Sequence, residues 1–317
     1  MLPSAPSNTK GILLFCAGMM GFATGDSLLK LALRTYPFEQ AMMIRLGLFV
    51  LIALAIAHRR GGVARAVRTG RPWLQLARGS VLVVDSLAFS ISLSFIGLSG
   101  AHAIYATVPL FVTALAVPLL GEHVGWRRWS AVMIGFAGTL LVIQPGTGTF
   151  GLVSLLALAG AFSSSFYSIL TRLVSRTDPI ETSFFYVALI GFLAIAPMGI
   201  WKWQTPDLLG LLLFAGMTGA SLIGHLGVIR ALTVAEATVL QPFQYVLLAT
   251  ATTYGVLLFG EQLQALKVAG TAIVVASGLY VAWREYVLAR RGLRLNAESP
   301  PADRAPRQTD IGPGAPS

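Results

Sequence analysis

Hydrophobic residues along this chain gather in long runs rather than alternating with polar ones. Each run holds about 20 mostly apolar residues, the length that an α-helix needs to cross roughly 30 Å of hydrocarbon. Short segments rich in proline, glycine or charge separate the runs. The pattern predicts an all-α polytopic membrane protein with ten transmembrane helices, at 11–33, 39–57, 73–97, 100–120, 126–144, 151–173, 180–201, 207–230, 236–259 and 264–284.

The overall composition supports a membrane protein. Of the 317 residues, 55% are hydrophobic and 11% are charged, and the mean hydropathy is +0.73. A soluble domain has about a quarter of its residues charged, so the apolar surface here is expected to face lipid. Cys16 is the single cysteine, which excludes an internal disulfide and a cysteine-based metal site.

The basic residues are distributed unevenly between the two sides of the predicted bundle. With a cytoplasmic N-terminus, 17 of the 23 lysines and arginines fall on the cytoplasmic side, four fall outside, and Arg45 and Arg78 lie within spans. Cytoplasmic loops carry such an excess of positive charge, so both termini are predicted to be cytoplasmic. The basic residues form no stripe with exposed aromatic side chains, and nucleic acid is not an expected partner.

Two short matches indicate an internal repeat. Residues 25–40 align with 167–182 at an offset of 142, and 119–126 resembles 258–265. Five spans per repeat is an odd number, so the second repeat must cross the membrane in the opposite direction, a transporter architecture. Matches this short can also arise by chance. The expected domains are a cytoplasmic N-terminus (1–10), two five-helix repeats (11–144 and 151–284) and a basic, proline-rich disordered tail (285–317).

Ionisable side chains inside the spans are the first candidates for a site. An Asp, Lys or Arg at the centre of a span costs at least about 2.5 kcal/mol, so it persists mainly when paired or facing water. Asp26 and Lys30 share one helix face at i, i+4 spacing, and Arg45 lies at a similar depth. We expect one cluster, which is either a structural salt bridge or an outer gate that recognises anions.

Asp85 is predicted to lie near the middle of the third span. Burial brings a carboxyl into a titratable range, which suits proton coupling or substrate contact. The competing interpretation is a structural pair with Arg78, about 10 Å nearer the cytoplasm, with Arg45 or with a polar partner in another helix. His225 in the eighth span is either a packing residue or part of the site. Glu122 and Glu261 at span ends are expected to be cap or loop residues.

Neutral hydrogen-bonding and aromatic side chains complete the candidate site. Amides in lipid need partners, and tyrosines suit a ring-bearing solute, whereas small serines and threonines also serve close helix packing. Two prolines are candidate helix breaks because each removes a backbone hydrogen bond. These candidates are Tyr105, Tyr167, Gln241, Gln244, Tyr245, Pro109 and Pro242. Such a lining suits a planar or zwitterionic metabolite better than an inorganic ion.

The chain resembles the EamA-type branch of the drug/metabolite transporter superfamily. The resemblance lies in the opening KGILLFCAGMMGFATGDSLLKLA, in residues 99–146 with Pro109 and Gly121-Glu122, and in Pro242 and Gly260-Glu261 of the second repeat. It covers about 10–284 and implies the fold, metabolite transport and a bacterial inner-membrane location. Its implication for substrate is weak, because similar proteins carry amino acids, S-adenosylmethionine or riboflavin in either direction.

The predicted function is therefore a secondary-active permease for a small organic metabolite, working by alternating access, with a proton or another ion as a candidate coupling partner and the lipid bilayer around it. A membrane-embedded enzyme or a channel is the alternative. The sequence contains no HExxH, CxxC or Walker-type motif, so neither an enzyme nor a bound cofactor or metal is expected. The substrate, the direction of transport and the formation of a homodimer stay open.

Overall fold

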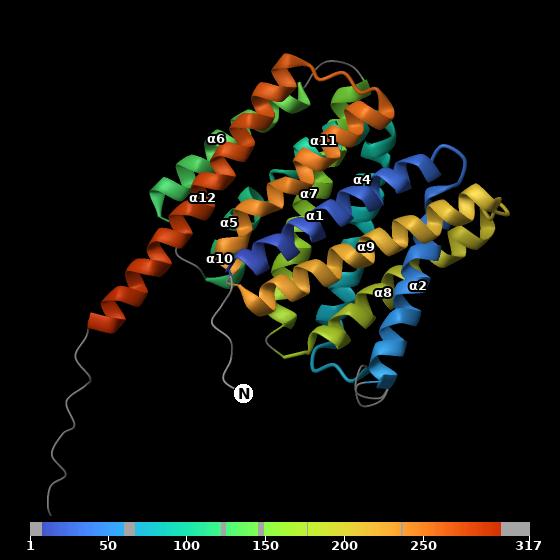
Figure 1. Ribbon diagram of the computed structural model, residues 1–317, viewed down its shortest axis with the longest axis horizontal. Coiled ribbons are helices and arrows are strands. Elements are labelled where there is room, and N and C mark those ends of the chain that lie inside the picture. The colour runs from blue at the N-terminus through green and yellow to red at the C-terminus, as the bar shows by residue number, and fades with distance from the viewer. Residues whose placement is uncertain are drawn as a thin grey trace, which may run out of the picture.

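The computed structural model describes residues 8–59, 67–121, 125–144, 149–175, 177–235 and 237–298. These segments form helices without strands (Figure 1). The helices are α1 (Asn8–Ala32), α2 (Phe38–Arg59), α4 (Pro72–Tyr105), α5 (Val108–Leu120), α6 (Trp126–Ile143), α7 (Thr149–Val174), α8 (Ile180–Trp201), α9 (Leu208–Val234), α10 (Ala237–Leu240), the 3₁₀ helix η1 (Gln241–Gln244), α11 (Tyr245–Phe259) and α12 (Ala265–Glu298).

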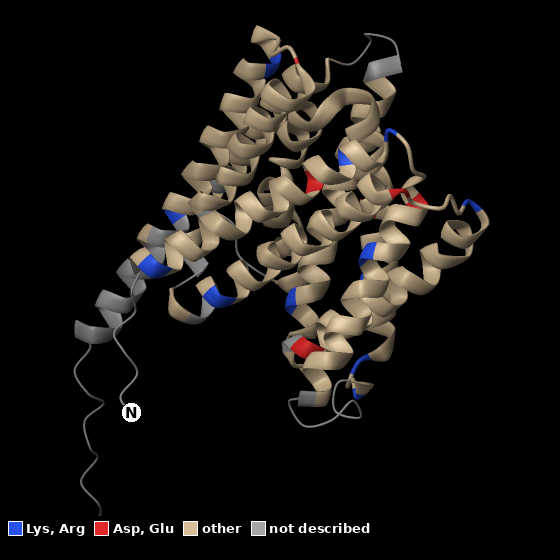
Figure 2. Ribbon diagram, turned by 45° about the vertical axis from the view of Figure 1, so that its right-hand side comes forward, with Lys and Arg blue, Asp and Glu red and all other residues tan. Residues whose placement is uncertain are grey.

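The described residues contain eight helical segments long and apolar enough to cross a membrane, and two shorter apolar helices, Val108–Leu120 and Trp129–Ile143. Large apolar side chains stand on the outside of the bundle, as Leu152 at 73% exposure and Leu208 at 74% illustrate. Charged residues are sparse along the helices and most lie toward their ends (Figure 2). The chain is therefore a multi-pass membrane protein.

Helices from the two parts of the chain pack in pairs. α1 lies along α9, α4 along α7, α2 along α8, and α6 along α12 (Figure 1). The first pair approaches closely because both helices present glycine: a Cβ added to Gly18 would lie 3.0 Å from the carbonyl oxygen of Gly224. Small residues let helices in lipid come into backbone contact, where van der Waals packing stabilises them.

One predicted break between spans lies at another residue, and one predicted span is divided at its candidate proline. The break expected near residue 100 lies at Gly97, whose φ of 82° suits only glycine, and helical structure then continues to Tyr105. The predicted ninth span, 236–259, divides into α10, η1 and α11 because Pro242 near the start of η1 cannot donate a helical hydrogen bond. Pro109 likewise lies in the first turn of α5.

The end of the last helix also differs from its predicted position. α12 continues to Glu298, so the tail predicted to be disordered from residue 285 is helical over 285–298. Alanine, leucine and arginine are frequent in this segment and all favour a helix, and its first proline after residue 285 comes only at Pro300. Residues 299–317 and most of the predicted N-terminus lie outside the described residues.

Candidate functional site

A cavity of about 640 Å³ lies inside the bundle and is lined by residues from α1, α2, α4, α7, α8, α9, η1 and α11. Its wall includes nine of the eleven candidate site residues: Asp26, Arg45, Arg78, Asp85, Tyr105, Tyr167, His225, Gln244 and Tyr245. Lys30 is not on its wall, and the side chain of Gln241 lies outside the described residues. Residues distant in the sequence thus line one cavity.

Asp85 is held by partners that sequence spacing did not reveal. The Tyr105 hydroxyl donates to Asp85 Oδ1 at 2.9 Å, and the Ser164 hydroxyl of α7 is a second hydrogen-bond partner. Tyr105 reaches Asp85 because the chain turns at Gly97 and runs back along α4. Gly160 leaves room for the tyrosine, since a Cβ there would lie 2.2 Å from its hydroxyl. Among the alternatives for Asp85, the pair with Arg78 does not form, and polar partners take its place.

Asp26 faces a histidine rather than Lys30. Its Oδ2 lies 3.3 Å from Nε2 of His102, and the side chain of Asp26 is 19% exposed while that of His102 is 4% exposed. The His102 ring meets Phe89 in a T-shaped arrangement with 5.2 Å between ring centroids. Asp26, His102 and Phe89 form one corner of the cavity.

Arg45 forms no ion pair with Asp26 or Asp85, two of the three carboxylates on the cavity wall, but lies within electrostatic range of both. Its Nε is buried without a hydrogen-bond partner among the described residues. His225 is also within electrostatic range of Arg45. Three phenylalanine rings surround this histidine, with centroid distances of 4.9, 5.6 and 5.9 Å from Phe22, Phe49 and Phe184.

A polar network holds Arg78 at another end of the cavity. Arg78 donates to Gln75 Oε1 at 2.9 Å and to the carbonyl oxygen of Ser183. Gln75 donates in turn to Asp178 at 2.8 Å, and the Gly70 backbone N–H donates to Asp178 at 3.0 Å. Burial raises the pKa of Asp178, but hydrogen bonds from Thr69, Gln75 and Gly70 outweigh it and lower the pKa below its usual value. Arg78 is thus engaged by the protein itself.

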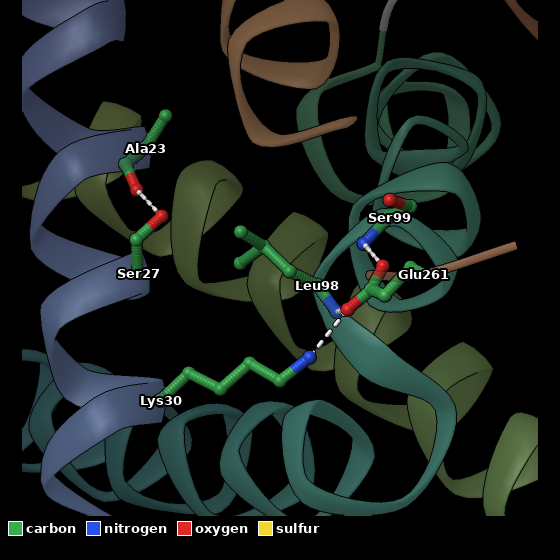
Figure 3. A network of polar contacts seen from close by, with 6 residues as sticks. All are labelled: Ala23, Ser27, Lys30, Leu98, Ser99 and Glu261. Carbon is green, nitrogen blue, oxygen red and sulfur yellow. Dashed lines mark hydrogen bonds and ion pairs between the residues drawn. The ribbon is translucent and has the colours of Figure 1, made fainter. Parts of the chain in front are cut away.

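Lys30 pairs with Glu261, not with Asp26, which corrects the predicted Asp26–Lys30–Arg45 cluster. Glu261 also accepts hydrogen bonds from the backbone N–H groups of Leu98 at 2.6 Å and Ser99 at 2.9 Å (Figure 3). These N–H groups are free because Gly97 interrupts α4 just before them. Glu261 therefore links α1, the Gly97 turn and the segment between α11 and α12, beside a second cavity of about 630 Å³.

The remaining candidates lie around the two proline-containing interruptions. Gln244, the last residue of η1, and Tyr245, the first of α11, line the cavity. The Tyr245 hydroxyl is buried without a hydrogen-bond partner among the described residues. It lies where a Cβ on Gly278 would be 1.6 Å away, so only glycine leaves space for it.

The model of the EamA-like transporter family matches this chain twice, over residues 9–144 and 151–283. Together these two ranges cover most of the sequence. The chain belongs to the EamA-like transporter family. Family membership explains why a helical bundle encloses a cavity with charged side chains on its wall: such proteins move small solutes, and a charged group within a span is tolerated where it faces a partner or a water-filled space.

Curated relatives of this family member are named transporters. It is 24% identical over 279 residues to the S-adenosylmethionine uptake transporter of Rickettsia prowazekii, covering 87% of this chain and 93% of the relative. It is 28% identical over 238 residues to the riboflavin transporter of Vibrio cholerae, covering 73% and 78%. A pseudopaline exporter of Pseudomonas aeruginosa is 26% identical over 275 residues, covering 84% and 94%. This chain is therefore a transporter of the drug/metabolite class.

A solved crystal structure shares the fold of this EamA-like chain. The two superpose with a TM-score of 0.59 at 18% sequence identity, over 84% of this chain and 95% of the other. At that identity the likeness concerns the fold alone. It supports the arrangement of helices that encloses the cavity.

His102 is the site residue that sequence reasoning missed. It is a histidine inside a predicted span, so the cost of an ionisable group in lipid could have singled it out. Its partner Asp26 is 76 positions earlier, on another helix, and no spacing rule connects the two. Ser164 was one of several serines in its span, and nothing in the sequence separated its contact with Asp85 from ordinary packing.

Proposed function

We propose that this chain is a secondary-active permease that moves a planar or zwitterionic metabolite by alternating access through the 640 Å³ cavity. The observation that carries the proposal is the cavity itself, where two carboxylates and Arg45 face a space lined from both matched ranges. The S-adenosylmethionine and riboflavin transporters among the relatives suggest the size and chemistry of the substrate. No feature of the described residues favours an enzyme or a channel.

The helix packing supports two inverted five-helix repeats. Two contacts between the repeats have counterparts with the roles exchanged: α1 packs on α9 as α7 packs on α4, and α1 packs on α11 as α7 packs on α5. Two further pairs, α2 with α8 and α6 with α12, join equivalent spans. Gly121 and Gly260 end equivalent helices in the same left-handed conformation, with φ of 69° and 64°. A two-fold relation of this kind lets the bundle change between an outward-open and an inward-open arrangement by exchanging the conformations of the two repeats.

The distribution of basic residues supports cytoplasmic termini in the bacterial inner membrane. In that orientation Lys30 and Glu261 lie at the outer end of the bundle, while Asp178 and its network lie at the inner end. The two groups of polar contacts then act at opposite ends of the cavity. In our proposal, the cavity opens to the outside when the contacts of Glu261 with Lys30, Leu98 and Ser99 break.

Asp85 is the proposed coupling carboxylate. It faces the cavity, and its hydrogen-bond partners Tyr105 and Ser164 are neutral hydroxyl groups that bring no positive charge. Arg45 lies within its electrostatic range, so arrival of a substrate at the cavity changes the field at Asp85. A proton taken up there on one side and released on the other would link transport to a proton gradient.

Counterflow in proteoliposomes tests the proposal. Purified full-length protein is reconstituted in vesicles loaded with unlabelled S-adenosylmethionine, riboflavin or an aromatic amino acid, and uptake of the same labelled compound is measured. At least one of these should exchange well above protein-free vesicles and should inhibit its own uptake when added outside. Exchange of inorganic ions with no exchange of any organic compound would contradict the proposal and favour a channel.

A further inference from the structure

We propose that the cavity reads two opposite charges on its substrate: Arg45 binds a carboxylate and Asp26 binds a cationic group. This inference rests on the proposed transport function and narrows it to zwitterionic substrates with a flat ring. A neutral planar solute would satisfy neither charge. The juxtaposition of Arg45, Asp26 and an aromatic cluster around one cavity carries the inference.

Arg45 is the cation in the cavity that the protein leaves unsatisfied. Arg78, the other arginine on the cavity wall, donates to Gln75 and to Ser183. Arg45 forms no ion pair with a carboxylate of the described residues, and its Nε is buried with no hydrogen-bond partner among them. The Nε of Arg78 is also without a partner among them, so the two arginines differ in the Nη groups of Arg78, which donate to the protein. A guanidinium offers five N–H donors in a planar fork that fits a carboxylate with two parallel bonds. A substrate carboxylate would supply the missing partner.

Asp26 is the carboxylate better placed to receive a substrate cation. Asp85 already accepts a hydrogen bond from the Tyr105 hydroxyl and is partnered by Ser164. Asp26 keeps 19% of its side chain exposed, and its neighbour is His102 at 3.3 Å. Two separate roles follow, in which Asp85 holds the coupling proton and Asp26 holds the positive group of the substrate.

Phe22, Phe49 and Phe184, which line the cavity around His225, form the aromatic cluster. The cluster is close to Arg45, since Phe49 lies one turn after it on the same face of α2. Aromatic rings bind a flat ring by offset or edge-to-face contact. A substrate whose ring lies here would have its carboxylate beside Arg45.

Separated charges in a low-dielectric interior favour a ligand that bridges them. Arg45 and Asp26 lie within electrostatic range of one another but do not pair. Each charge loses part of its hydration when the cavity closes, and a zwitterion replaces that hydration at both ends. A neutral ligand displaces the water and leaves both charges unpaired, so binding is weakened.

A series of ligands that lose first the negative charge and then the positive charges tests the assignment. The probes are S-adenosylmethionine, its decarboxylated form, which keeps the ammonium and the sulfonium, and 5′-methylthioadenosine, which lacks the carboxylate and both positive charges. Binding to the purified full-length protein is measured by thermal stabilisation and by competition in counterflow. The wild-type protein should bind S-adenosylmethionine at least about tenfold more tightly than the decarboxylated form, as charge-assisted bidentate bonds predict.

The variants identify the residue that reads each group. Arg45→Gln should reduce the ratio of the affinities for S-adenosylmethionine and its decarboxylated form to about one, while the affinity for the decarboxylated probe stays unchanged or improves. Arg45→Lys should keep part of the preference for the carboxylate. Asp26→Asn should lower affinity for the decarboxylated probe toward that for 5′-methylthioadenosine. Arg34→Gln is the matched control, because Arg34 is an exposed arginine that is not on the cavity wall.

Two results would overturn this assignment. One is a folded Arg45→Gln protein, with wild-type melting behaviour, that keeps the full preference for the carboxylate. The other is tight binding of neutral riboflavin together with no binding of any zwitterionic probe. That result would leave the proposed metabolite transport intact but would contradict recognition of substrate charges by Arg45 and Asp26. Absence of counterflow for every organic compound would instead contradict the proposed function.

Discussion

Single residues decide whether charges in this bundle face one another or face the cavity. The i, i+4 spacing of Asp26 and Lys30 predicted a local pair, yet Lys30 reaches Glu261, 231 positions away, and Asp26 meets His102. Spacing rules see only one helix, whereas the Gly97 turn supplies two backbone N–H groups that draw Glu261 and with it Lys30. The membership of most candidate residues in one cavity was predictable, because polar side chains in lipid must converge.

Gly160→Ala should disturb the site without removing a polar group. The added methyl would lie 2.2 Å from the Tyr105 hydroxyl and 2.9 Å from the Cβ of Ala88, so Tyr105 must move and its bond to Asp85 is lost. We expect folded protein with at least about tenfold slower transport, comparable to Tyr105→Phe. Gly219→Ala is the matched control, since its Cβ would meet no atom within 4 Å. Equal transport by the Gly160 and Gly219 variants would remove Tyr105 from the site.

Asp85→Asn keeps the shape of the side chain and removes its proton exchange. We expect the variant to lose accumulation driven by a pH gradient while it retains counterflow, because exchange needs no net proton movement. Proteoliposomes with and without an imposed gradient separate the two activities. Normal gradient-driven accumulation by a well-folded Asp85→Asn protein would end the coupling role.

At the scale of elements, the positions of the interruptions in the helices are harder to predict from the sequence than the helices themselves. The sequence located the apolar spans because hydrophobic length is a strong signal. It misplaced the break in α4 by a few residues, whereas the candidate helix break Pro242 does lie where the ninth span divides. Glycine and proline signal a possible break, but tertiary contacts select which one occurs. At Gly97 that contact is Glu261, whose carboxylate occupies the space that a Cβ would fill.

The contact between Lys30 and Glu261 should behave as a coupled pair. Lys30→Gln and Glu261→Gln should each lower thermal stability, and the double variant should be milder than their sum, because each single change leaves one charge without its partner. Transport rates of the same variants show whether the contact must break during the cycle. Additive losses in stability would argue against coupling.

The pH dependence of this contact follows from the loop position of Glu261. Desolvation raises its pKa, but hydrogen bonds from Lys30, Ser99 and Leu98 outweigh that effect and lower the pKa below the usual 4.5. A lowered folded-state pKa means that the stabilisation is complete above 4.5 and is lost as the pH falls through the folded value. Melting temperatures of wild type and Glu261→Gln should therefore differ at pH 7 and converge in acid below pH 4.5. A constant difference would contradict this.

At the scale of the whole molecule, the orientation in the membrane is a property that the sequence predicts. Reporter fusions after residues 62 and 284 should both indicate the cytoplasm, and a fusion after residue 148 the opposite side. The physical reason is the concentration of 17 of 23 basic residues on one side. Residues 62 and 148 reporting the same side would rule out the inverted model.

The partnership of α1 with α9 has a consequence for how the protein is made. The glycine face of α1 finds its counterpart only after the chain beyond Leu208 has emerged, because Gly18 and Gly21 contact Gly224 and Ala220. At ordinary rates of synthesis, that interval is on the order of ten to forty seconds. During this time the first helix lies in the bilayer with its small-residue face against lipid. Final assembly therefore happens late, and a ribosome that stops before Leu208 leaves an inserted but incomplete bundle.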